Sequence, residues 1–514
     1  MITVKGSGLS VATTATKDSL NAITASLAAK DSALWGKEAE TEAAIRLNWI
    51  DLPIASRALL PELDALTAWS ASKSISTIVL AGMGGSSLAP EVIAKTFNKK
   101  LTVLDTTDPD QITAAIPTDL AHSLVVVGSK SGSTIETASH KAFFTKLYQD
   151  AGLVPADHFV IVTDPGSPLD KSARADGLRV INADPNVGGR YSALSAFGLV
   201  PAALIGVDVS ILIDDAAAAA KTFTQANSVA VTLAAAIFDR NEQSVAFFDA
   251  GSDLPGLSDW IEQLIAESTG KNETGRLPIV IESDSAPTAG AGLRIGFKDG
   301  VNADLIVIGS LGEQFILWEW VTALLGFALK VDPFNQPNVT EAKERTGALL
   351  STWKDGKVPN IKAAFENDLL AVYSISAVKT LTGQLEAFLA NSNYYFAIMA
   401  YLARGIDDQA PALRAVVASK SGKATTFGWG PRFLHSTGQF HKGGQHNGAF
   451  LQITGENKVD LAIPQQNFTF HTLLMAQAIG DGQALATRKF PVVRIHLKNR
   501  QAGLELLLEE LSKL

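Results

Sequence analysis

The run Thr77-Ile-Val-Leu-Ala81 is followed by the turn Gly82-Met-Gly-Gly-Ser-Ser87 and by a helical pattern from about Leu88. The apolar run is continuous rather than alternating, which is typical of a strand covered on both faces. A strand, a tight turn and a helix in this order form the repeating unit of a parallel α/β layer. This stretch therefore predicts the fold class, α/β with mainly parallel sheets.

The same rhythm recurs along the chain. Strands are expected at 101–104, 123–127 and 159–163, and a second series at 245–248, 277–281 and 305–308 follows an alanine-rich helix. We therefore predict two αβα sandwich domains. The expected organisation is an N-terminal helical segment at 1–75, a first domain at 76–235, a second domain at 236–350 and a C-terminal α/β extension at 351–514.

Composition excludes several classes of function. The chain has 514 residues, enough for about three domains, with a net charge of −9 and no run of Lys or Arg. A partner nucleic acid or an anionic membrane surface needs a basic patch, so we expect neither. The absence of cysteine excludes thiolate metal sites and cysteine nucleophiles.

Nothing in the sequence indicates export or membrane insertion. The start, Met1-Ile-Thr-Val-Lys-Gly, lacks the pattern of a signal peptide. The most apolar stretch, 315–331, carries Glu319 and Lys330 and is too short to cross a bilayer, so we predict a buried helix there. We expect a soluble, cytoplasmic protein.

Two strand-to-helix turns are candidates for binding an anion. Residues 82–87 bring glycines next to a helix N-terminus, where free N–H groups carry partial positive charge. Residues 128–134, Gly-Ser-Lys-Ser-Gly-Ser-Thr, place four hydroxyls and one ammonium at the same kind of position, which suits a phosphate monoester. The second turn lacks the Gly-Lys-Ser/Thr ending of a nucleotide-binding loop, so the pattern favours phosphate binding without NTPase chemistry.

Further segments hold isolated candidates. Arg190 follows two glycines, so it can approach a ligand closely, or it is an ordinary surface arginine. Glu267 ends an apolar helix, where burial raises a carboxyl pKa and suits a general base, although such residues are often found at a helix rim. Residues 435–446 hold three histidines whose spacing fits no common metal motif, so we expect no metal.

Taken together, these segments resemble phosphoglucose isomerases, and most closely the isomerase part of bacterial transaldolase/isomerase fusions. The family pattern combines Gly-x-Gly-Gly-Ser, Ser-Lys-x-x-x-Thr, Gly-Gly-Arg-Tyr-Ser, Glu-Ser-x-Gly-Lys and Phe-Asp/Asn-Gln-x-x-Val-x-x-x-Lys, and the chain has all five in that order. The resemblance covers roughly 77–345 and 430–453. It implies two domains of the sugar-isomerase (SIS) type and a sugar-phosphate substrate.

The resemblance also implies roles for single residues. Glu267 would move a proton between C1 and C2, Arg190 would stabilise the enediolate oxygen, and Lys343 with a histidine would help to open the sugar ring. The expected substrate contacts are Gly85, Ser86, Ser129, Lys130, Ser131, Thr134 and Gln336. The implied reaction interconverts glucose 6-phosphate and fructose 6-phosphate, as in glycolysis and gluconeogenesis, without a cofactor.

The histidine segment departs from the usual order. In many relatives it lies between the glutamate and lysine motifs, whereas here Leu434-His-Ser-Thr-Gly-Gln439 follows both. The form of this segment favours His435 as the histidine that helps to open the sugar ring. His441 remains an alternative for this role. Family members place this segment at a neighbouring subunit's site, which implies a homodimer.

Other functions remain possible at this stage. A non-catalytic SIS-domain sensor of sugar phosphates would keep the Ser129 loop, but it has no need for Glu267, Arg190 and Lys343 together and usually carries a DNA-binding segment that is not evident here. A further alternative is the isomerase half of an amidotransferase, but such an enzyme would also need a catalytic cysteine, and the chain has none. A dinucleotide dehydrogenase would depend on the Gly82 turn alone.

Overall fold

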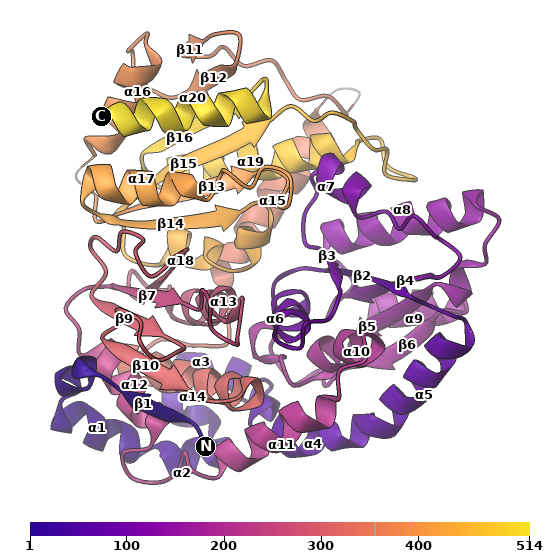
Figure 1. The fold of residues 1–514 in the computed structure, drawn as a ribbon, viewed down its shortest axis with the longest axis vertical. Coiled ribbons are helices and arrows are strands. Elements are labelled where there is room, and N and C mark those ends of the chain that lie inside the picture. The colour runs from indigo at the N-terminus through magenta and orange to yellow at the C-terminus, as the bar shows by residue number, and fades with distance from the viewer. Residues whose placement is uncertain (354–355, 392) are drawn as a thin grey trace.

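The strands of the protein form three sheets. The structure is a computed structural model that describes residues 1–353, 356–391 and 393–514. One sheet lies in the right-hand lobe of Figure 1, and the other two are stacked on the left. The α/β class with mainly parallel sheets, predicted from the 77–88 stretch, is confirmed.

The first sheet is wholly parallel, with the order β3-β2-β4-β5-β6. Its central strands β4 and β5 are buried along their entire length, as their continuous apolar runs predict. The strands are β2 Thr77–Gly82, β3 Thr102–Leu104, β4 Ser123–Gly128, β5 Phe159–Thr163 and β6 Arg179–Asn182, and the helices are α6 Leu88–Thr96, α7 Pro109–Ala114, α8 Ile135–Asp150, α9 Pro168–Ala175 and α10 Ala196–Leu204.

The second sheet has the order β1-β10-β9-β7-β8, and β1 is its one antiparallel strand. β1 comes from the segment predicted to be helical, and three residues are too few for a periodic signal. The strands are β1 Thr3–Lys5, β7 Ser244–Phe248, β8 Leu277–Val280, β9 Leu293–Gly296 and β10 Leu305–Ile308, and the helices are α11 Val209–Ala220, α12 Val229–Phe238, α13 Leu257–Thr269 and α14 Leu311–Leu329.

The C-terminal part, expected as an α/β extension, contains a sheet of its own. Its order is β11-β12-β16-β15-β13-β14, and β13 to β16 run parallel. The strands are β11 Phe365–Glu366, β12 Leu370–Tyr373, β13 Tyr395–Tyr401, β14 Ala424–Trp429, β15 Gly448–Gly455 and β16 Val492–Leu497, and the helices are α15 Pro337–Thr352, α16 Leu381–Leu389, α17 Ala412–Ser421, α18 Gly438–Gly443, α19 Phe470–Thr487 and α20 Arg500–Lys513. The predicted domain boundaries stay predictions.

Helix α14 is the buried helix predicted at 315–331, and it packs in one core with the N-terminal helices. Trp35 donates a hydrogen bond from Nε1 to the Ala323 carbonyl (3.0 Å) and its ring meets Phe334 edge-on. The N-terminal helices are α1 Thr14–Asn21, α2 Thr24–Ala28, α3 Lys37–Ala43, α4 Leu52–Ala55 and α5 Leu60–Ser72. No helix in the described ranges is both long and apolar enough to cross a membrane.

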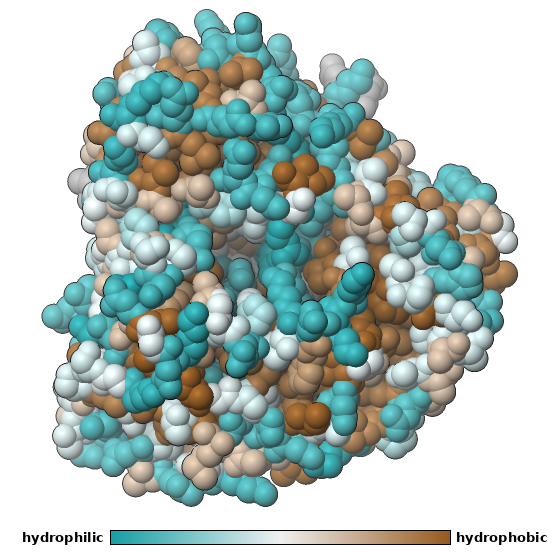
Figure 2. Space-filling view, in the orientation of Figure 1, coloured by the Kyte–Doolittle hydropathy of each residue, from teal (hydrophilic) through white to brown (hydrophobic). Residues whose placement is uncertain are grey.

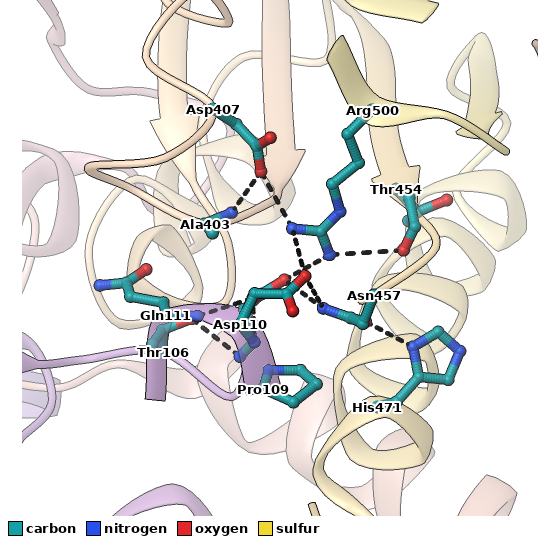
Figure 3. Close-up of polar contacts among 12 residues, drawn as sticks. Thr106, Pro109, Asp110, Gln111, Ala403, Asp407, Thr454, Asn457, His471 and Arg500 are labelled. Carbon is teal, nitrogen blue, oxygen red and sulfur yellow. Dashed lines mark hydrogen bonds and ion pairs between the residues drawn. The ribbon is translucent and has the colours of Figure 1, made fainter. Parts of the chain in front are cut away.

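A polar junction joins the first sheet's α7 to the third sheet (Figure 3). Arg500, at the start of α20, places its Nη2 2.6 Å from Asp108 Oδ2 and its Nη1 2.9 Å from Asp407 Oδ2. The Asn457 amide donates to both Asp108 and Asp110. These buried contacts fix the third sheet, which carries the histidine segment, against the first. The surface is hollowed where the right-hand lobe meets the other two sheets (Figure 2).

Candidate active site

The Gly82 turn brings separate motifs into contact. The chain after β2 forms a short 3₁₀ turn at Gly84–Ser86. A Cβ on Gly85 would lie 1.9 Å from the Gly189 carbonyl oxygen, and Gly84 has a φ of +56°, with Gln263 Nε2 and the His435 carbonyl within 3 Å of a Cβ placed there. Only glycine fits these positions, because a side chain would push the arginine and histidine segments away.

The hydroxyl-rich loop lies at the carboxyl end of β4 and leads into the 16-residue helix α8. Ser129 Oγ accepts a hydrogen bond from the Gly132 N–H (3.2 Å), and the hydroxyl of Thr134 lies 3.4 Å away. Ser131 and Ser133 are exposed, with their hydroxyls 2.7 Å apart. Their exposed oxygens and the helix N-terminus leave a position suited to an anion.

The Lys130 ammonium is directed away from this position. Its Nζ forms an ion pair with Asp164 Oδ2 at 2.7 Å and donates to the Pro185 carbonyl at 2.9 Å. Burial lowers the pKa of Lys130, although the Asp164 carboxylate opposes the shift. The predicted contact between Lys130 and phosphate would therefore come from its backbone rather than from its side chain.

Arg190 and Glu267 form a buried pair. The Arg190 Nη1 lies 3.2 Å from Glu267 Oε1, and the two residues are 4% and 8% exposed. Arg190 also donates from Nε to Ser268 Oγ (2.9 Å) and from Nη1 to Gln336 Oε1 (2.8 Å), and its Nη2 donates to the carbonyls of Pro333 and Asn335 (2.8 Å each). The guanidinium is therefore a fixed positive charge beside Glu267, because its donors are already in use.

Gln263 connects this pair to the histidine segment. It precedes Glu267 by one turn of α13, and its Nε2 donates both to Glu267 Oε2 (3.1 Å) and to the His435 carbonyl (2.9 Å). A second connection runs through Gln439 of α18, whose Nε2 donates to Asn338 Oδ1 (2.8 Å) and to the Gly270 carbonyl (2.9 Å). Segments far apart in the chain are thus held at one place.

His435 lines a cavity with a carboxylate that the sequence did not single out. Its Nε2 lies 3.0 Å from Glu136 Oε1, and Gln477 donates to the same oxygen at 2.7 Å. Burial would raise the pKa of Glu136, but the charges of His435 and Lys343 and the hydrogen bond from His435 lower it below its ordinary value. The cavity, of about 170 Å³, is lined by Ser133, Ile135, Glu136, Val339, Ala342, Lys343, Thr346, Gly347, Leu434, His435 and Gln477.

His441 lies elsewhere. Its ring is buried among aromatic side chains, and its Nδ1 lies 3.1 Å from the Tyr395 hydroxyl. Burial, with the nearby Lys442 charge, lowers the pKa of His441 to about 3. Of the two candidates, the structure brings His435 to the cavity with Lys343.

Three site residues were missed by the sequence reasoning. Glu136 lies in the first turn of α8, two residues after the hydroxyl loop, where an acidic residue is usually explained by the helix dipole. Gln263 stands four residues before Glu267, a spacing that puts both on one helix face. Gln477 has no local signal, because only folding brings α19 to this cavity.

The fold and this constellation define an αβα protein in which a hydroxyl-rich loop, a buried acidic–basic pair and a histidine come together. Residues 64–287 match the family model described as "Phosphoglucose isomerase", and this match confirms the resemblance that the motifs predicted. The match includes the hydroxyl loop, Arg190 and Glu267, and it ends before Lys343 and His435.

Curated relatives and a solved structure agree with this family. A glucose-6-phosphate isomerase of Thermus thermophilus is 34% identical over 234 residues, which are 44% of this chain and 56% of the relative. That of Thermosynechococcus vestitus is 37% identical over 38% of this chain and 40% of the relative. The chain thus spans about half the length of these relatives. A glucose-6-phosphate isomerase structure from Chlamydia trachomatis shares the fold, with a TM-score of 0.50 and 22% identity over 61% of this chain and 76% of that one.

Proposed function

We propose that the protein catalyses the reversible isomerisation of glucose 6-phosphate and fructose 6-phosphate through an enediol. The observation that carries the proposal is the buried pair of Glu267 and Arg190, joined through Gln263 to the His435 segment. A base beside a fixed cation is what proton transfer between C1 and C2 needs, because negative charge develops on the substrate oxygen as the proton leaves.

The phosphate-binding residues, His435 and Lys343 also have a place in this scheme. The exposed hydroxyls of the Ser129 loop and the start of α8, with Ser86 and the backbone at Gly85, would hold the phosphate. His435, with Nε2 directed at Glu136, keeps Nδ1 for the sugar, where it would move a proton between the ring oxygen and O1 during ring opening. Lys343 lies in the same cavity and would stabilise the oxygen charge in that step.

A single chain contains every residue that the scheme uses. The family resemblance implied that a second subunit supplies the histidine, but here His435 lies beside Glu136 of its own chain. The expected homodimer, like the cytoplasmic location, stays a prediction. Sedimentation of the purified protein would test the dimer, and activity that persists at dilutions where only monomer is present would support a site complete in one chain.

Conversion of fructose 6-phosphate to glucose 6-phosphate, with chelator present, tests the proposal directly. We expect turnover by the wild type and by Glu505→Gln, an exposed control on α20. Glu267→Gln should lose activity by about 10²–10⁴-fold, the usual contribution of a general base. No turnover by the wild type, with fructose 6-phosphate still bound, would instead favour the non-catalytic sensor.

A further inference from the structure

A second cavity, of about 160 Å³, borders the same turn that carries His435 and has no part in the proposed reaction. Its lining includes Asp259 and Glu262 of α13, Arg414 of α17, Trp429 of β14 and Arg432, which lies on the same 3₁₀ turn (Arg432–His435) as His435. Because its walls come from elements packed on all three sheets, the cavity exists only in the folded chain. We name it the Glu262 cavity.

The arginines in its wall already have partners. Arg414 donates from Nε and Nη2 to the two carboxylate oxygens of Glu282, at 2.6 and 2.7 Å. Arg432 pairs with Glu91 Oε2 at 2.9 Å and with Asp105 Oδ2 at 3.3 Å. These guanidiniums are therefore neutralised within the wall, so the cavity offers no free cation to an anionic ligand.

Two acidic side chains of the wall, Asp259 and Glu262, form no ion pair with any residue that the structure describes, whereas Glu282 pairs with Arg414. Glu262 is 7% exposed, and its Oε1 accepts no hydrogen bond from any residue that the structure describes. Asp259, one turn earlier on α13, has no ion pair within the described ranges. Burial and the Asp259 charge raise the pKa of Glu262 well above its usual value, although the nearby Arg432 charge opposes the shift. A buried carboxyl without a partner is costly, and a bound cation would remove that cost.

The remaining wall is apolar and aromatic. Phe427 and Trp429 meet edge to face with centroids 5.1 Å apart, and Phe433, Leu88 and Val280 complete the surface. Carboxylates beside aromatic rings suit a cation that carries carbon, because the rings attract positive charge and the walls offer few oxygens to a bare metal ion. From this combination we infer that the Glu262 cavity binds a small organic cation, an alkylammonium ion.

The Glu262 cavity and the proposed active site use neighbouring residues of the same two elements. Glu262 precedes Gln263, whose amide bonds both Glu267 and the His435 carbonyl, and Arg432 and Phe433 begin the turn that ends at His435. The inferred binding does not depend on the proposed reaction, because calorimetry measures the heat of binding without any turnover.

The test is calorimetric titration of the full chain with n-butylammonium chloride at pH 8, against n-butanol and KCl at matched ionic strength. We expect saturable heat from butylammonium alone, with affinity that falls as the pH is lowered and Glu262 takes up a proton. Asp259→Asn and Glu262→Gln should each weaken binding about tenfold or more, because each removes one charge, while the exposed Glu344→Gln on α15 should not.

Three results would overturn the inference. Equal binding of butanol would mean that the cavity binds only the apolar chain. Competition by KCl at equal concentration would mean that the site accepts an inorganic cation. Unchanged affinity in both acidic variants would exclude Asp259 and Glu262 as the groups that bind the cation. If either acidic variant fails to fold by circular dichroism, Trp429→Leu provides the second measurement. It removes one aromatic wall and keeps both charges, so it should also weaken binding.

Discussion

Replacement of Glu136 by Gln tests the least expected element of the site. The substitution keeps the size of the side chain and an acceptor oxygen, but it removes the negative charge 3.0 Å from His435 Nε2. We expect this change to slow the opening of the sugar ring, because the histidine loses the charged partner that fixes its orientation.

The magnitude follows from burial. The Glu136 side chain is 4% exposed, so solvent screens its interaction with His435 only weakly. A hydrogen bond to a charged group contributes about 1.5–3 kcal/mol, which corresponds to about a 10- to 150-fold loss of turnover with fructose 6-phosphate. The assay couples glucose 6-phosphate formation to its oxidation, and Glu344→Gln, an exposed position next to Lys343, is the matched control.

An open-chain substrate separates the two steps of the reaction. An aldotetrose 4-phosphate cannot form a furanose ring, since its C4 oxygen carries the phosphate. Deuterium exchange at its C2 should therefore depend on Glu267 and be nearly unaffected in Glu136→Gln. Equal losses on both substrates would refute the ring-opening role and would show that Glu136 supports the site as a whole.

Three further predictions concern the close approach at the Gly82 turn, the junction with the third sheet and one titrating carboxyl. Gly85→Ala places a Cβ against the Gly189 carbonyl and should abolish measurable turnover while circular dichroism stays unchanged. Arg500→Met leaves three buried carboxylates without their cation and should lower the free energy of unfolding, measured in urea, by about 3–5 kcal/mol. Burial raises the pKa of Asp249 from 3.8 to about 6, so this residue favours the folded state below about pH 4 and loses that contribution as the pH rises through 6. Asp249→Asn should therefore stabilise the protein at pH 7 by on the order of 3 kcal/mol, with little change at pH 4.

Each of these has a contrary outcome. Normal turnover in Gly85→Ala would mean that the arginine segment can move away from the turn. A change below about 1 kcal/mol in Arg500→Met would place that junction in a solvated environment. A stability difference for Asp249→Asn that does not vary with pH would show that the pKa of the Asp249 carboxyl is not raised in the folded state.

Much of the fold could be predicted from the sequence, because its signals are local. The continuous apolar runs before the Gly82 turn and the Ser129 loop indicate buried parallel strands, and both turns lead directly into helices. Strands β1, β6 and β9 and most of the third sheet were missed. β1, β6 and β9 have only three or four residues, too few for a clear periodic signal, and the third sheet's strands lie in a region whose pattern is mixed.

The sequence by itself also determined which residue types meet in the site, since Arg190, Glu267 and Lys343 occur in motifs that carry their own chemistry. Only the tertiary structure decided their partners. It brings His435 rather than His441 to Lys343, adds Glu136 and Gln477, and turns the Lys130 ammonium toward Asp164. The physical reason is that ion pairs and hydrogen bonds between residues distant in the chain depend on packing, for which local sequence carries no signal.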